Sequence, residues 1–135
     1  MQTITLENDY QLFFVNVPDF PLGIKEKFIE LQQMLPNMQH RTFYGLSYMN
    51  DEDIVIYNCA VTELEKGEAA KYGGTPFTLE KGEYLAEPIH DWMDKLDTIG
   101  LTLEKLMDNP TADKSFPCVE WYKTETELMC MVKKA

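Results

Sequence analysis

The chain has 135 residues, 44% of them apolar, which is enough for one domain with a hydrophobic core but too few for two. Its formal net charge of −11 repels phosphate backbones, and no cluster of Lys and Arg offsets that charge, so no direct contact with nucleic acid is expected. No apolar window is long enough to cross a bilayer, and the start MQTITLENDY lacks the pattern of a secretory signal, so we expect a cytoplasmic protein with no membrane partner.

The first half of the chain predicts the element order β-α-β-β. Residues 10–17 (YQLFFVNV) form an aromatic and β-branched run that a proline closes, which is typical of a strand. Residues 42–49 and 54–61 are two further β-rich runs, and the polar sequence NDED between them suits a hairpin turn. Between the first run and this hairpin, apolar residues recur at helical spacing before Pro36: Ile24, Phe28, Leu31 and Leu35.

The second half of the chain repeats this order. A polar bridge at 63–72 leads into an extended run over 75–87. Pro88 is tolerated at the first position of a helix, and Gly100 is expected to end or kink that helix. The runs CVEWYK and ELMCMVKK then predict a second hairpin that turns at 124–126. The apolar face of the predicted helix consists of Ile89, Trp92, Met93 and Leu96.

Two such units predict a single α+β domain over residues 1–135, with pseudo-repeat halves at about 10–63 and 75–134. We expect their strands to form an antiparallel sheet with two main helices on one face. Tyr48 and Tyr122, each just before a hairpin turn, are predicted to occupy equivalent positions. Because the hairpin strands are apolar on both faces, the second face needs cover from loops or a partner, unless it contributes to a ligand cleft.

Glu120 is the residue that most strongly indicates a functional site. It lies in PCVEWY between the apolar residues Val119 and Trp121. Transfer of a carboxylate into such surroundings is costly unless the group is paired, hydrogen-bonded or protonated. Among aromatic rings, an ionised glutamate attracts a lipophilic cation. The alternative is a glutamate on an edge strand that faces solvent, and the sequence does not decide between the two.

Four features together resemble one known family: the two β-α-β-β halves, the segment TPFTLEKGEYLA, the helix carrying Trp92, and Glu120-Trp121-Tyr122 ahead of an apolar strand. Over about residues 10–134 they are similar to the GyrI-like small-molecule-binding domain, also called the AraC-type effector-binding domain. The resemblance implies binding of hydrophobic and often cationic compounds, as in multidrug binding, in the service of transcription regulation. It places Glu120 in the ligand pocket and implies aromatic walls, for which the candidates are Tyr48, Tyr57, Trp92 and Tyr122.

We therefore expect a stand-alone domain that binds a small hydrophobic or cationic effector, for sensing or sequestration, without catalysis. Two alternatives stay open. Glu120 can serve as the general base of a small-molecule hydrolase, with a tyrosine that orients the substrate. The acidic surface can also bind a basic protein partner and inhibit it, as the resemblance implies for relatives that bind a topoisomerase, or it can simply keep the domain soluble.

No cofactor and no metal ion are expected. His40 and His90 each stand alone, and His90 shares a predicted helix face with Asp94 but lacks a third ligand. The pair Gly73-Gly74 has no surrounding phosphate-binding motif. The three cysteines are odd in number and lack CxxC spacing, so they are interpreted as small buried residues: Cys59, Cys118 and Cys130.

Overall fold

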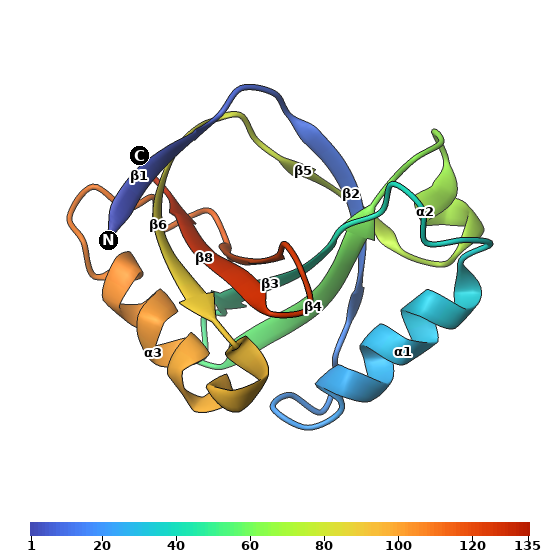
Figure 1. Cartoon of the computed structure of the whole chain (residues 1–135), viewed down its shortest axis with the longest axis horizontal. Helices are drawn as coiled ribbons and strands as arrows, with labels where there is room; N and C mark the ends of the chain where they lie inside the picture. The colour runs from blue at the N-terminus through green and yellow to red at the C-terminus, as the bar shows by residue number, and fades with distance from the viewer. The chain divides into compact units, whose positions relative to one another are not determined.

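The structure, a computed structural model, describes all residues, 1–135, and divides into two compact units. Unit 1 joins Met1–Asp9 to Glu80–Ala135, and unit 2 is Tyr10–Leu79. Each unit contains four antiparallel strands and one main helix. Figure 1 labels these main helices, α1 in unit 2 and α3 in unit 1. The α+β class and the repeated β-α-β-β order are therefore as predicted.

Unit 2 consists of β2 (Tyr10–Asn16), α1 (Ile24–Met34), β3 (Phe43–Met49), β4 (Val55–Thr62), α2 (Glu68–Lys71) and β5 (Thr75–Leu79). The strand order is β3-β4-β2-β5, with every neighbouring pair antiparallel. Helix α1 covers one face of this sheet through Leu31, which is completely buried. Because side chains alternate along a strand, the β4 residues beneath the helix are every second one: Tyr57, Cys59 and Val61.

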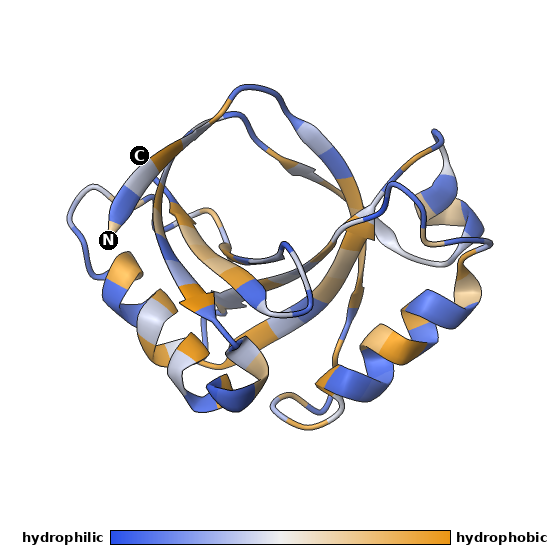
Figure 2. Ribbon diagram, in the orientation of Figure 1, coloured by the Kyte–Doolittle hydropathy of each residue, from blue (hydrophilic) through white to orange (hydrophobic).

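Unit 1 consists of β1 (Gln2–Leu6), β6 (Gly82–His90), the short 3-10 helix η1 (Trp92–Asp94), α3 (Leu96–Met107), β7 (Cys118–Tyr122) and β8 (Glu127–Lys133). The strand order is β1-β6-β8-β7. Helix α3 buries Ile99, Leu103 and Leu106 against the sheet. The β8 residues beneath it are Leu128, Cys130 and Val132. Figure 2 shows the corresponding alternation of apolar and polar residues along both main helices.

The strand registers align the two units residue by residue. Cys59 of β4 and Cys130 of β8 hold the same place in the rows beneath the helices. Two residues before them, Tyr57 pairs with Ser47 and Leu128 pairs with Tyr122. Ser47 is therefore the counterpart of Tyr122, and the predicted equivalence of Tyr48 is wrong by one residue. A shift of one residue in a strand moves a side chain to the opposite face.

The start of the second helix also differs from the prediction. Strand β6 continues through Pro88 to His90, and the helix begins only at Leu96. The pairing of β1 with β6 ends at Gln2 opposite Ala86, so Pro88 lies where β6 has only β8 beside it. A proline is tolerated there because no strand on the β1 side of β6 needs a hydrogen bond from the backbone N–H that proline lacks.

The remaining differences concern helices and an edge strand. Gly100 lies inside α3, which neither ends nor breaks at this residue. Strand β1 was not predicted, and α2 is a four-residue helix within the predicted polar bridge at 63–72. None of the helices is both long and apolar enough to cross a membrane.

Candidate functional site

Glu120 lies on β7, on the face of the unit 1 sheet that α3 covers. Its direct cross-strand partner is Cys130, which belongs to the core beneath α3. Residues directly opposite each other in an antiparallel pair share a face, so the Glu120 side chain points to the same side. Glu120 is only 6% exposed. Of the two alternatives that the sequence left open, the structure therefore has the buried glutamate.

Tyr122 and Trp92 extend the site from Glu120. The Tyr122 hydroxyl donates a hydrogen bond to Glu120 Oε1 at 2.5 Å, as two residues on the same face of one strand can. Trp92 of η1 meets Tyr122 edge to face, with ring centroids 5.0 Å apart and an interplanar angle of 67°. The indole Nε1 donates to the Thr124 carbonyl at 3.4 Å, which ties η1 to the β7–β8 turn. Three of the predicted site residues thus come together within unit 1.

The pKa values of the two thiols near Glu120 depend on burial and on the charge of Glu120. Burial, with the nearby Glu120 charge adding to it, raises the pKa of Cys118 to about 11. The same two causes, burial first, raise the pKa of Cys130 to about 12. Both thiols are reduced and protonated at neutral pH. Burial disfavours a charge of either sign, so only the negative charge of Glu120 distinguishes between ligands here, and it favours a cation over an anion.

The two remaining predicted residues belong to unit 2. Tyr57 is 3% exposed and stacks on Phe20 in the core beneath α1, with ring centroids 5.2 Å apart. Tyr48 is 48% exposed and pairs across the hairpin with Ile56. Tyr57 pairs directly with Ser47, which is the neighbour of Tyr48 along β3. Because neighbouring residues of a strand point to opposite faces, the side chains of Tyr48 and Tyr57 lie on opposite faces of the unit 2 sheet.

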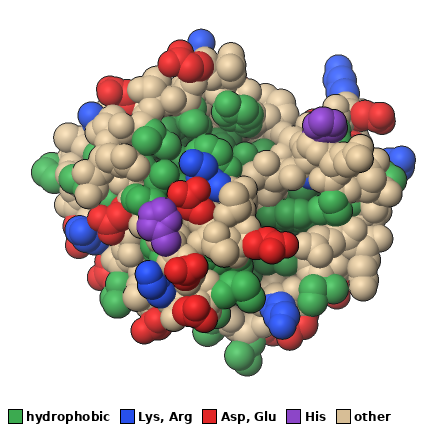
Figure 3. Space-filling view, in the orientation of Figure 1, with side chains coloured by type: hydrophobic (Ala, Val, Ile, Leu, Met, Phe, Trp, Pro, Cys, Tyr) green, Lys and Arg blue, Asp and Glu red, His purple; other side chains and the backbone are tan.

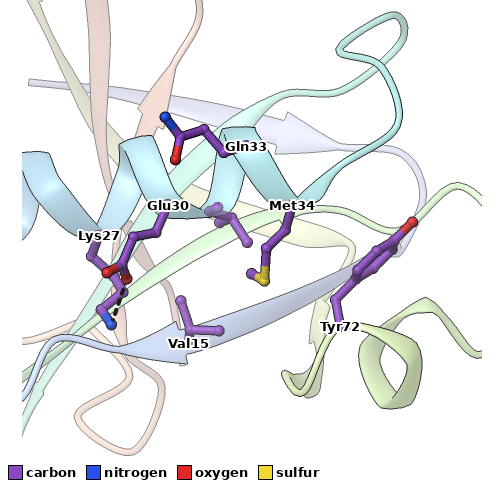
Figure 4. Close-up of a pocket in the computed structure, with 7 residues that line it drawn as sticks. Val15, Lys27, Glu30, Gln33, Met34 and Tyr72 are labelled. Atoms are coloured by element: carbon purple, nitrogen blue, oxygen red, sulfur yellow. Dashed lines mark ion pairs between the residues drawn. The ribbon is translucent and has the colours of Figure 1, made fainter.

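Unit 2 also has an open groove of about 490 Å³ between α1 and β2, shown in Figure 4. Lys27 and Glu30 of α1 form an ion pair at its edge, with Lys27 Nζ 2.9 Å from Glu30 Oε2. The Glu30 side chain is 60% exposed, so solvent and its partner largely screen its charge. The groove is therefore a weaker candidate for charge-selective binding than the surroundings of Glu120. Its other lining residues are Val15, Leu31, Gln33, Met34 and Tyr72.

A buried ion pair in unit 2 was not predicted. The Arg41 guanidinium donates to both carboxylate oxygens of Glu68, at 3.1 and 2.7 Å, and the two side chains are 2% and 7% exposed. Glu68 also accepts from the Leu64 amide at 2.7 Å. The hydrogen bonds from Arg41 lower the pKa of Glu68 to about 2, although burial acts in the opposite direction. This pair joins the start of α2 to the segment before β3 and has a structural role.

The residues weighed as metal ligands do not form a cluster. His90 ends β6 and Asp94 ends η1, and the nearest acid to His90 is Glu127, with His90 Nδ1 3.8 Å from its Oε1. No group of three or more His, Cys, Asp or Glu side chains is arranged to hold a metal ion. On the face drawn in Figure 3, the Lys and Arg side chains are scattered and do not gather into a basic patch.

Solved structures share this fold over almost the whole chain. An integron cassette protein from the mobile metagenome of Vibrio cholerae is 11% identical, with a TM-score of 0.69 over 99% of this chain and 95% of that one. SAV2435 bound to tetraphenylphosphonium is 16% identical, with a TM-score of 0.62 over 99% and 93%. A proposed bacterial transcription regulation protein from Staphylococcus aureus Mu50 is 16% identical, with a TM-score of 0.58 over 98% and 97%.

These likenesses establish the fold and leave the family open. No protein-family model matches the chain, and no curated protein matches its sequence. The resemblance to the GyrI-like domain therefore stays a prediction. The structure therefore defines the class of protein only by its architecture, which is an α+β fold of two β-α-β-β units. Unit 1 of this fold carries a buried glutamate beside aromatic rings.

Proposed function

We propose that this protein is a small-molecule-binding domain whose ligand is hydrophobic and positively charged and lies beside Glu120. The observation that carries the proposal is the placement of that carboxylate, 6% exposed and hydrogen-bonded by Tyr122, whose ring in turn contacts Trp92. A carboxylate in a low-polarity environment interacts more strongly with a cation than one in water. Aromatic faces add attraction for the same kind of ligand.

The negative charge of Glu120, which contributes to the raised pKa values of Cys118 and Cys130, supports the choice of a cation over an anion. Both thiols resist ionisation because they are buried and because Glu120 is near. Burial would oppose a ligand of either charge, whereas the nearby carboxylate would oppose only an anionic ligand at this place. Tyr122 can keep its hydrogen bond to the carboxylate while the ring faces of Tyr122 and Trp92 contact an apolar ligand surface.

Two of the structures with this fold agree with such a role. SAV2435 is bound to tetraphenylphosphonium, which is a hydrophobic cation, and the other protein is assigned to transcription regulation. We infer that this chain senses or sequesters a hydrophobic cation, and that it serves transcription regulation through another component. The cytoplasmic location expected from the sequence stays a prediction, and so do ligand contacts by Tyr48 and Tyr57.

Titration with tetraphenylphosphonium tests the proposal. The full chain should show a saturable rise in melting temperature with this cation and a much smaller one with neutral triphenylphosphine oxide, because only the cation interacts with the carboxylate. Glu120→Gln should weaken binding of the cation by about tenfold or more, measured by calorimetry, and should leave affinity for the neutral compound nearly unchanged.

Glu125→Gln is the matched control, since it removes the same charge from the exposed β7–β8 turn. It should bind like the unaltered protein, which would exclude an effect of net charge alone. Equal binding of the cation by Glu120→Gln and the unaltered chain would contradict the proposal. Turnover of an electrophilic compound that is lost in Glu120→Gln would instead favour the hydrolase alternative.

A further inference from the structure

The tip of the β3–β4 hairpin exposes large apolar side chains on both of its faces. Tyr48 is 48% exposed, Met49 59%, Ile54 53% and Val55 39%. Met49 pairs directly with Val55, and Tyr48 pairs with Ile56, so the two cross-strand pairs face opposite sides. Exposed apolar residues are normally scattered singly, whereas these four lie together. We call these four residues with the turn 50–53 the hairpin tip.

The turn of the hairpin tip carries three carboxylates next to this apolar surface. Asp51, Glu52 and Asp53 are consecutive and exposed. None of them takes part in the ion pairs of the chain. Their negative charge is therefore available to a partner, and it adds to the −11 of the whole chain.

Asn50 holds the turn in one conformation. Its side-chain Oδ1 accepts hydrogen bonds from the amides of Glu52 at 2.9 Å and Ile54 at 3.0 Å. Its own amide donates to the Ile54 carbonyl at 2.9 Å. Asp53 adopts a left-handed backbone conformation with φ of 60°. An ordered turn loses less entropy on binding than a mobile loop, so the entropic cost of binding a partner at this surface is reduced.

The equivalent hairpin of unit 1 does not have this surface. The β7–β8 turn consists of polar residues, with Thr124 Oγ1 accepting from the amides of Thr126 and Glu127. Its last strand residue, Tyr122, is half-buried against Trp92. A hairpin in this fold therefore does not need exposed apolar residues at its tip, and those of β3–β4 require another explanation.

We propose that the hairpin tip is a docking surface for a basic, amphipathic polypeptide. Apolar residues on both faces require a partner that encloses the tip, such as a groove or a segment that wraps around it. The carboxylates of Asp51, Glu52 and Asp53 require Lys or Arg around that apolar contact. A second copy of this chain would bring like charges together, and so would an anionic membrane surface. This surface lies in unit 2 and does not depend on the role proposed for Glu120.

A short synthetic peptide of leucine and lysine in an amphipathic helical pattern serves as the probe, and an all-lysine peptide of equal charge serves as its control. Binding of the fluorescent peptides to the full chain is measured by anisotropy at low and moderate salt. Two double variants separate the contributions of the tip: Met49→Ser with Val55→Thr, and Asp51→Asn with Glu52→Gln. Each should weaken binding of the amphipathic peptide by about tenfold.

Matched controls lie outside the hairpin tip. Leu101→Ser removes an apolar residue of α3 that is 67% exposed, more than Met49 or Val55, and Glu125→Gln removes an exposed charge. Both should change the affinity by less than about twofold. Glu120→Gln should also leave it unchanged, which separates this site from the proposed ligand site.

Several results would overturn the inference. Unchanged binding in the Met49 and Val55 double variant, or equal binding of the all-lysine peptide, would mean that overall charge alone attracts the probe. Self-association that disappears in this variant would identify a second copy as the partner, and binding to phosphatidylcholine vesicles would identify a membrane. Circular dichroism verifies folding, and Ile54→Ser tests the same surface if the strand variant unfolds.

Discussion

Replacement of Glu68 by Gln tests how much the buried ion pair of unit 2 stabilises the protein. In the folded chain, two hydrogen bonds from Arg41 hold the Glu68 carboxylate in its charged form and lower its pKa from 4.5 to about 2. A drop of about 2.5 pKa units corresponds to about 3 kcal/mol of stability at neutral pH, at about 1.4 kcal/mol per unit. Solvent screens little of this, because the two side chains are 2% and 7% exposed.

The lowered pKa also gives the direction of the pH dependence. A carboxyl group whose pKa is lower in the folded state contributes its full stability above its unfolded pKa of 4.5, and this contribution is lost as the pH falls through about 2. Glu68→Gln leaves the Arg41 charge buried without a counter-charge at every pH. We therefore expect the variant to be less stable by about 3 kcal/mol at neutral pH, with a difference that shrinks towards acid pH.

Urea unfolding of both proteins, from neutral pH down to about pH 3, measures this difference. Glu125→Gln, in which an exposed carboxyl group is removed, should differ from the unaltered protein by less than about 0.5 kcal/mol throughout. A difference between Glu68→Gln and the unaltered chain that stays constant with pH would refute the linkage argument. Equal stability at neutral pH would refute the role of the ion pair itself.

Three further predictions concern two glycines and the thiols near Glu120. Gly100→Ala should raise the free energy of unfolding by about 0.5–1 kcal/mol, because Gly100 lies inside α3 with open space beside it. Gly74→Ala should lower the free energy of unfolding by about 1–3 kcal/mol, because a Cβ there would lie 2.8 Å from Phe13 Cδ2. Urea unfolding of both variants measures these changes. A Gly74→Ala variant as stable as the unaltered protein would contradict the close packing of Gly74 against Phe13. Half-buried Cys118 and buried Cys130, with pKa values of about 11 and about 12, should react slowly with a disulfide reagent at mildly alkaline pH, and rapid labelling of both in the folded protein would contradict these raised values.

The order of elements could be predicted because strands and helices repeat their apolar residues with different periods. The helical spacing from Ile24 to Leu35 predicts a helix, whereas ELMCMVKK contains a continuous apolar run whose short length and preceding polar turn predict a strand that is buried on both faces. The start of the second helix could not be predicted in this way. A proline such as Pro88 is compatible with the first turn of a helix and also with a strand that has no neighbour on one side. Which of the two forms depends on where β1 stops pairing with β6.

Neither the burial of Glu120 nor the Arg41–Glu68 pair could be read from the sequence. Whether Glu120 is buried depends on which face of β7 is covered by α3, and that is a property of the tertiary fold. Arg41 and Glu68 are 27 residues apart, and both lie in polar stretches. Helix α2, which positions Glu68, has only four residues and therefore shows no periodicity.

The comparison of the two units gives the strongest argument that Glu120 is present for binding rather than for folding. Cys59 and Cys130 hold the same place in the cores of the two units. Opposite Cys59 stands Gly45, and opposite Cys130 stands Glu120. A β-α-β-β unit of this chain thus forms with no side chain at that position, while its counterpart places there a buried carboxylate, which must be desolvated and is hydrogen-bonded by Tyr122. A buried carboxylate at a position where the other unit forms without a side chain is the pattern expected of a functional site, and it is the reason why we predict that Glu120→Gln folds normally while it loses selectivity for cations.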